Sequence, residues 1–99
     1  MIVDPPSFAP SAKSVEKAKA AYTRLFAAAA KVTVEGGLLA ACSCSSHIDA
    51  ELFLELCRSA LSQARRRGTV LQITGQPADH PWPLACPELR YLKFVLFRV

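Results

Sequence analysis

The sequence predicts an α/β fold in which short strands alternate with two main helices around a single sheet. Two stretches carry apolar residues at steps of three and four, the spacing of an amphipathic helix. Short apolar runs bounded by glycine or proline lie before, between and after these stretches. The resulting order is strand, helix, strand, helix, strand, loop, strand. Such alternation is typical of a sheet with right-handed crossovers.

The composition indicates one small folded domain. The chain has 99 residues, of which 52% are hydrophobic and 20% charged. Disordered chains have low hydrophobicity and high net charge, so this class is excluded. The longest apolar run, residues 25–30, is far shorter than the ~18 residues of a membrane span. The first residues have neither a basic segment nor a long apolar one, so we also expect no secretory signal.

Charge and cysteine content leave two interpretations of the surface open. The chain has 12 Lys and Arg against 8 Asp and Glu, a net charge of +4. Part of the excess lies in the first helix and part in Arg65, Arg66 and Arg67, as in a polyanion-binding surface or a solvated helix face. The 4 cysteines include no C-x-x-C pair. We therefore expect free thiols in a reducing cytoplasm, and neither a disulfide framework nor a metal site.

The first strand is expected to be short, because Pro5 and Pro6 follow Ile2 and Val3 and cannot donate to a strand ladder. A helix is predicted from residue 11 or 14 to residue 34. Its apolar repeat is Val15, Ala18, Tyr22, Leu25, Ala29 and Val32. The glycine pair at 36 and 37 is expected to supply the left-handed residue that ends this helix.

A second strand is predicted over residues 38–42, where a continuous apolar run indicates a strand covered on both faces. Either a capping box beginning at Ser46 or Asp49 itself starts the second helix. We expect this helix to run to about Arg67 and to stop at Gly68. Its apolar repeat is Leu52, Leu56, Ala60 and Ala64.

The last part of the chain combines two strands with a long connection. Residues 70–74 alternate as a third strand, and residues 91–99 read as a fourth strand rich in Phe, Val and Leu. Between them, residues 75–89 contain 4 prolines and are predicted to be irregular. A connection of this length suggests a role of its own.

Two reactive side chains follow predicted strands. Asp4 comes after the first strand and Cys44 after the second, and ligands bind beyond the carboxyl ends of strands in open parallel sheets. A carboxylate and a thiol at one edge could serve as acid and nucleophile. A strand-end cysteine is also commonly a small buried apolar residue, so both interpretations stay open here.

Several short motifs occur in a fixed order along the chain. They are Asp4-Pro5-Pro6-Ser7-Phe8, Tyr22, Gly36-Gly37, Ser43-Cys44-Ser45, Gln76-Pro77-x-Asp79-His80-Pro81, Pro87-Glu88 and Tyr91-Leu92-Lys93. In this order the chain resembles the C-terminal part of the bacterial class I S-adenosylmethionine-dependent methyltransferases that make 5-methylcytosine in large-subunit ribosomal RNA. Each motif alone is weak, but the ordered set covers nearly the whole chain and is specific.

The resemblance implies the strand order. Class I methyltransferases order their sheet 3-2-1-4-5-7-6, with strand 7 antiparallel. This chain would supply 4-5-7-6, the C-terminal half of a Rossmann-like sheet. Residues 1–99 are therefore expected to be a partial methyltransferase domain. The glycine-rich cofactor turn, the acidic residue for the ribose and the RNA-binding domain of the family are expected before Met1.

The resemblance also implies the site residues. Asp4, Pro5 and Pro6 would lie beside the cofactor S-adenosyl-L-methionine, Asp4 would hold the target base, and Cys44 would be the nucleophile. Cys42 would only pack.

Three further residues are candidates for substrate binding: Ser45, Asp79 and His80. For Asp79 and His80 a turn fixed by Asp and Pro is an equal alternative. The family carries Lys after the helix Tyr and Asn near Phe26, whereas this chain has Thr23 and Phe26, so the target nucleotide stays open.

The sequence thus predicts a fragment of a ribosomal RNA (cytosine-C5) methyltransferase, cytoplasmic and inactive alone. The alternative is a non-enzymatic half-domain that acts as a structural oligomer with weak nucleic-acid affinity. In either case we expect a homodimer through the first strand, which lacks a neighbour, or through the first helix. The apolar surface of that helix around Leu25, Phe26 and residues 27–30 would be exposed.

Overall fold

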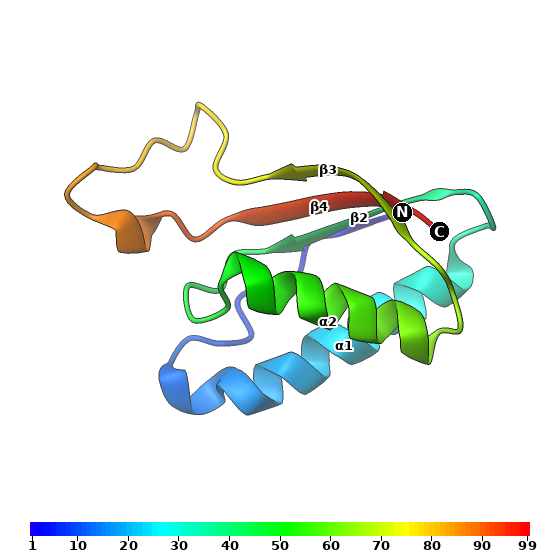
Figure 1. Cartoon of the computed structure of the whole chain (residues 1–99). Coiled ribbons are helices and arrows are strands. Elements are labelled where there is room, and N and C mark those ends of the chain that lie inside the picture. Colours follow the sequence, from blue (N-terminus) through cyan, green and yellow to red (C-terminus); the bar gives the residue numbers. More distant parts are fainter.

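The structure, a computed structural model that describes all of residues 1–99, contains one mixed sheet with both main helices on the same face (Figure 1). The elements in chain order are β1 (Ile2–Val3), the 3₁₀ turn η1 (Ala12–Ser14), α1 (Val15–Val32), β2 (Leu38–Ser43), α2 (Ala50–Gln63), β3 (Thr69–Thr74), the 3₁₀ turn η2 (Pro87–Leu89) and β4 (Lys93–Arg98). The predicted alternation of strands and helices is confirmed.

The sheet has the order β1-β2-β4-β3. β1 is parallel to β2, and β4 is antiparallel to both of its neighbours. This confirms the predicted 4-5-7-6 order with its antiparallel last strand. In the register of β2 and β4, Ser43 lies opposite Lys93. The carboxyl ends of β1, β2 and β3 therefore share one edge of the sheet with the amino end of β4.

An aromatic cluster joins the two helices. The ring centroids of Tyr22 and Phe26 in α1 lie 6.2 and 5.7 Å from that of Phe53 in α2. All three side chains are at most 1% exposed. Phe8 extends the cluster, with its ring centroid 4.9 Å from that of Tyr22. Such pairs contribute roughly 0.5–1.5 kcal/mol each beyond the apolar area they bury. Neither helix is long and apolar enough to cross a membrane.

The end of α1 differs from the prediction. The helix ends at Val32, Thr33 is already extended, and Gly36 with φ +76° lies in the turn before β2 instead of capping the helix. Val32, predicted to be a core position, is 68% exposed because it lies in the last, uncovered turn. The glycine pair therefore shapes the turn into β2.

The end of α2 also differs, and an arginine takes the place predicted for glycine. The helix ends at Gln63, and Arg65 adopts the left-handed conformation with φ 54°. The N–H of Arg66 donates to the carbonyl of Leu61 at 2.9 Å, and the N–H of Arg65 donates to the carbonyl of Ser62 at 3.0 Å. These two bonds form a Schellman motif. Gly68 therefore does not end the helix.

One of two predictions about surface coverage is wrong. β2 was predicted to be covered on both faces, and Leu39, Ala40 and Ala41 are at most 4% exposed although both helices lie on one face; only Leu38, the first residue of the strand, is 47% exposed. The apolar surface of α1 was predicted to be exposed, but Phe26 is 1% and Ala30 0% exposed because α2 and the sheet cover them. The open edge of β1 is as predicted, with Ile2 76% exposed.

The start of α2 gives the first testable prediction. The Asp49 carboxylate accepts a hydrogen bond from the N–H of Leu52 at 2.8 Å, so Asp49 and not Ser46 is the N-cap. Asp49→Ala should lower the free energy of unfolding by about 1 kcal/mol in urea denaturation, because a helix N–H loses its partner. Asp49→Asn should keep most of the stability, since its amide oxygen can cap. Equal stability of Asp49→Ala and the parent chain would contradict this role.

Candidate active site

The candidate site lies at the edge where β1 and β2 end, next to the long connection formed by residues 75–92 (Figure 1). Asp4 directly follows β1 and is exposed, and Cys44 directly follows β2 and is half-buried. The two residues therefore occupy the same edge, as the sequence predicted. The catalytic roles assigned to them stay predictions.

A network of buried hydroxyl groups fixes the backbone on both sides of Cys44. The Tyr22 hydroxyl is hydrogen-bonded to Ser43 Oγ at 3.0 Å and to Ser45 Oγ at 2.7 Å. The N–H of Ser45 donates to Ser43 Oγ at 3.2 Å. Tyr22, Ser43 and Ser45 are all 0% exposed. Because side chains alternate along an extended segment, two serines turned toward α1 leave Cys44 pointing away from it.

The same network reaches the loop that follows Asp4. Ser7 Oγ is hydrogen-bonded to Ser45 Oγ at 3.2 Å, so the Asp-Pro-Pro-Ser segment and the Cys44 segment are tied together. Pro5 is buried, whereas Asp4 and Pro6 are exposed. Pro5 therefore shapes the turn, and Asp4 and Pro6 are the members of the motif that are open to solvent.

Lys93 places a cation beside Cys44. Its Nζ donates to the carbonyl of Ser45 at 2.5 Å, and the side chain is half-buried. Burial lowers the pKa of Lys93, while the negative charges of an ionised Cys44 and of Asp49 favour its ammonium form. A neighbouring ammonium group stabilises a thiolate, the reactive form of cysteine. Lys93 was assigned no role from the sequence, although it belongs to the Tyr91-Leu92-Lys93 motif, because its contact with the Ser45 carbonyl depends on the register of β4 against β2.

The structure pairs Asp4 with Cys42. Burial raises the pKa of the Cys42 thiol, and the Asp4 carboxylate raises it further. Both residues line a hollow of about 440 Å³ together with Gln72, Thr74, Pro77 and Phe94. Cys42, which the resemblance makes only a packing residue, therefore faces a surface that a ligand could enter. Its raised pKa disfavours the thiolate form.

The predicted substrate-binding residues lie in different environments. The Ser45 hydroxyl is buried and bonded to Tyr22 and Ser7, so this side chain supports Cys44 from within. Asp79 and His80 are exposed, with Asp79 Oδ1 and His80 Nδ1 3.1 Å apart. This hydrogen bond holds the pKa of Asp79 below its usual value. The two residues do not line the hollow beside Asp4, and substrate contact stays a prediction for all three.

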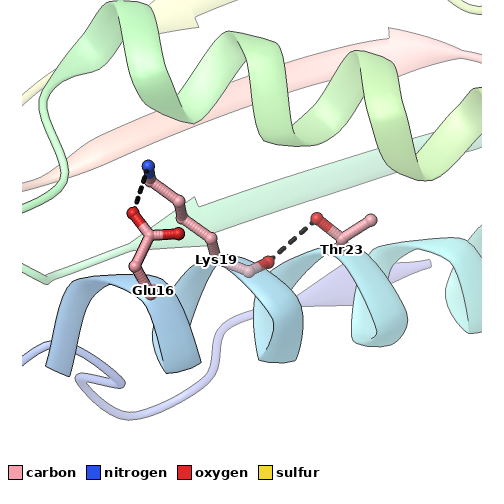
Figure 2. A network of polar contacts seen from close by, with 3 residues as sticks. All are labelled: Glu16, Lys19 and Thr23. Carbon is pink, nitrogen blue, oxygen red and sulfur yellow. Dashed lines mark hydrogen bonds and ion pairs between the residues drawn. The ribbon is translucent and has the colours of Figure 1, made fainter.

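The two departures from the family pattern are both buried in α1. The Thr23 hydroxyl donates to the carbonyl of Lys19 at 2.9 Å, and Lys19 Nζ donates to Glu16 Oε1 at 2.8 Å (Figure 2). Thr23 is 8% exposed, and Phe26 lies in the aromatic cluster. Thr23 thus satisfies its hydroxyl within the helix, and Phe26 contributes to the core.

The structure brings together no group of three or more His, Cys, Asp or Glu side chains that could hold a metal ion.

Comparison with solved structures defines the class of fold. A candidate methyltransferase crystallised as a complex with SAH superimposes with a TM-score of 0.77 at 25% identity, covering 99% of this chain and 25% of that one. A candidate SAM-dependent methyltransferase from Streptococcus mutans gives a TM-score of 0.76 at 21% identity, covering 99% and 24%. The chain therefore has the α/β fold of one part of a methyltransferase.

Comparison with curated proteins shows which methyltransferases this chain is similar to in sequence. Ribosomal RNA large subunit methyltransferase I of Pseudoalteromonas atlantica is 33% identical over 99 residues, which is 100% of this chain and 25% of that protein. The protein of the same name in Photobacterium profundum is 37% identical over 93 residues, covering 94% and 23%. No protein-family model matches the chain. The homologues of this chain are thus large-subunit ribosomal RNA methyltransferases, and it spans about a quarter of their length.

The environments of the thiols give the second prediction. In the folded chain near neutral pH, iodoacetamide should alkylate Cys44 well before Cys57, as measured by timed peptide mapping. Cys57 is 5% exposed, and burial raises its pKa to about 12, so its thiolate is scarce. Lys93→Met should slow the alkylation of Cys44 and leave that of Cys86 unchanged, because Lys93 lies near Cys44 and does not share a hollow with Cys86. Cys57 reacting first would contradict this description of the site.

Proposed function

We propose that residues 1–99 are part of a methyltransferase domain that transfers a methyl group from S-adenosyl-L-methionine to C5 of cytosine in large-subunit ribosomal RNA. The observation that carries this proposal is the fixed position of Cys44, held between two buried serines beside Lys93 and at the same edge as Asp4. The names of the homologous enzymes support ribosomal RNA as the substrate. The neighbour complexed with SAH supports the methyl donor.

The low reactivity of cytosine at C5 explains why the proposed reaction needs a thiol. Its C5 is a weak nucleophile, so the Cys44 thiolate first adds to C6 and forms an S–C6 bond, which makes C5 electron-rich. S-adenosylmethionine would supply the methyl group from its positively charged sulfur, whose S–CH3 bond breaks and leaves the neutral thioether S-adenosylhomocysteine. After C5 has accepted the methyl group, a base removes the C5 proton. The electron pair of the C–H bond then expels the Cys44 thiolate and restores the aromatic ring.

The other residues of the edge have supporting roles in this proposal. Asp4 accepts hydrogen bonds from the N3 and N4 edge of the base and stabilises its protonated form while Cys44 is attached. Lys93 stabilises the free thiolate before attack and after elimination. Ser45 and Tyr22 position Cys44, and Asp79 and His80 contact the RNA from the long connection.

The isolated chain is expected to be inactive. Asp4 and Pro6 touch only one side of a bound S-adenosylmethionine. In our proposal the remaining contacts come from a glycine-rich turn in the three quarters of the enzyme that this chain does not span. We place the complete enzyme in the cytoplasm, with its ribosomal substrate.

The third prediction concerns the nucleophile. Residues 1–99 are grafted onto the Photobacterium profundum relative in place of the quarter that they match. The graft should produce 5-methylcytidine in ribosomal RNA, detected by nuclease digestion and mass spectrometry. Cys44→Ala should lower kcat by at least about 10³-fold, as losing a covalent nucleophile does, while S-adenosylmethionine binding is unchanged.

Cys42→Ala is the matched control for this experiment, since it removes a second half-buried thiol two residues away. It should keep activity within a few-fold of the parent graft. If Cys42→Ala abolishes methylation while Cys44→Ala does not, the nucleophile is Cys42 and the assignment above is wrong. A different methylated nucleoside would overturn the C5 chemistry.

The open edge of β1 favours the second candidate function, a structural oligomer. Ile2 is 76% exposed, and β1 has a neighbour on one side only. Unpaired strand edges recruit further chains, and a two-fold dimer with adjacent first strands would satisfy both edges. We therefore propose a homodimer of the isolated chain through β1. The buried apolar face of α1 leaves no such role for the residues around Phe26.

The fourth prediction is that the isolated chain forms a dimer, and light scattering tests it. The chain should have the mass of a dimer at tens of micromolar, and Ile2→Lys should shift it to a monomer, because a charge at the edge opposes strand pairing. Val34→Lys replaces another residue that is 76% exposed and should leave the dimer intact. A parent chain that is monomeric under the same conditions would contradict the proposal.

A further inference from the structure

A second hollow lies at the opposite edge of the sheet from Cys44, at the end of the molecule that carries both chain termini (Figure 1). Its volume is about 600 Å³. Four arginines line it, and we call it the arginine groove: Arg65, Arg66 and Arg67 from the turn after α2, and Arg98 from β4. The other lining residues are Glu35, Gly36, Thr69 and Val99.

The groove has a net positive charge. None of the four arginines forms an ion pair, and the negative groups among the lining residues are Glu35 and the terminal carboxylate of Val99, two against four. Guanidinium groups gathered in this way repel one another, and binding of a negatively charged ligand relieves the repulsion. The groove is therefore complementary to an anion.

The backbone of the groove is strained at one arginine and fixed at the next. Arg65, with φ 54°, is the only residue other than glycine with a positive φ, at a helix position where glycine fits without strain. Strain of this kind tends to persist where a side chain serves a ligand. Arg66 Nη2 donates to the carbonyl of Thr33 at 3.0 Å, which ties the turn after α2 to the end of α1. The turn that carries the arginines is thus fixed in position by this hydrogen bond.

We propose that the arginine groove binds the phosphodiester backbone of RNA. Guanidinium groups match phosphate oxygens in charge and geometry, and no aromatic side chain lines the groove to stack on a base. Such contacts hold a nucleic acid in place without reading its sequence. The choice of RNA as the source of the phosphates rests on the proposed function.

The position of the groove suits an RNA that also reaches Cys44. The six residues of β2 separate the two edges of the sheet, which at ~3.3 Å per residue is about 20 Å. B-form DNA would span this distance with about six base pairs at ~3.4 Å each, and the more compact A-form duplex of RNA needs at least that number. An RNA stem could therefore contact the groove while a nucleotide beyond it lies at Cys44.

The fifth prediction concerns RNA binding by the intact chain. It is measured by the fluorescence anisotropy of a fluorescein-labelled RNA hairpin over a series of salt concentrations. The double variant Arg65→Gly, Arg67→Ala should bind RNA at least several-fold more weakly. Its slope of log affinity against log salt should fall by ~0.9 for each lost phosphate contact to a duplex. Glycine relieves the strain at position 65 and Arg67 is exposed, so the melting temperature of the double variant should not fall. Weaker binding then does not reflect unfolding.

The control variant Lys17→Ala, Arg24→Ala removes the same charge from the exposed surface of α1. It should retain most of the affinity. Equal losses in both double variants would mean that only net charge attracts RNA, and would overturn the groove. Displacement of the hairpin by millimolar inorganic phosphate would overturn it as an RNA site, because single phosphates would then be sufficient ligands.

Binding of RNA by this chain and methylation by the grafted enzyme are separate measurements. A groove variant that binds RNA as tightly as the parent chain would overturn this inference and leave the proposed methyl transfer standing. If the graft makes no 5-methylcytidine while RNA binding still depends on the groove, the proposed methyl transfer is overturned and the inference about the groove stands.

Discussion

The Tyr22 hydroxyl holds the candidate site together, since it is bonded to the serines on both sides of Cys44. A buried hydroxyl without a partner costs about 1–3 kcal/mol, and here Tyr22, Ser43 and Ser45 satisfy one another. The ring of Tyr22 belongs to the aromatic cluster that joins α1 to α2. One residue thus connects the packing of the core with the position of the thiol, and Ser7 extends the connection to the loop after Asp4.

The path of β4 explains why a basic side chain lies at each of the two edges of the sheet. β4 is last in the chain but lies between β2 and β3, antiparallel to both. Its first residue, Lys93, therefore reaches the edge with Cys44, and its last residue, Arg98, reaches the arginine groove. A single strand supplies one cation to a thiol and another to a surface suited to phosphates.

The fold shows how a four-stranded sheet with helices on one face keeps a core of its own. Both helices lie on one face, so the aromatic cluster forms from residues within this chain. No helix covers the other face of the sheet, and no strand pairs with the outer edge of β1. Both features agree with a chain that spans about a quarter of the length of its curated relatives. The same incompleteness underlies both the expected inactivity and the proposed dimer.

The sequence by itself determined those features that depend on neighbouring residues. Apolar spacing marked both helices, prolines ended β1 and Asp49 was one of two candidates for the cap of α2. The order of elements placed Asp4 and Cys44 at one edge. The resemblance to known methyltransferases added the position of the last strand, which apolar spacing alone does not reveal.

Only the tertiary structure decided which side chains meet across segments. It gave the left-handed position after α2 to Arg65 instead of Gly68, placed Asp4 beside Cys42, and buried Ser45 under Tyr22. It also brought Lys93 to the backbone of Ser45. The physical reason is that spacing along a chain encodes local conformation, whereas a contact between distant segments depends on strand register and helix packing. Those are set by the whole core at once.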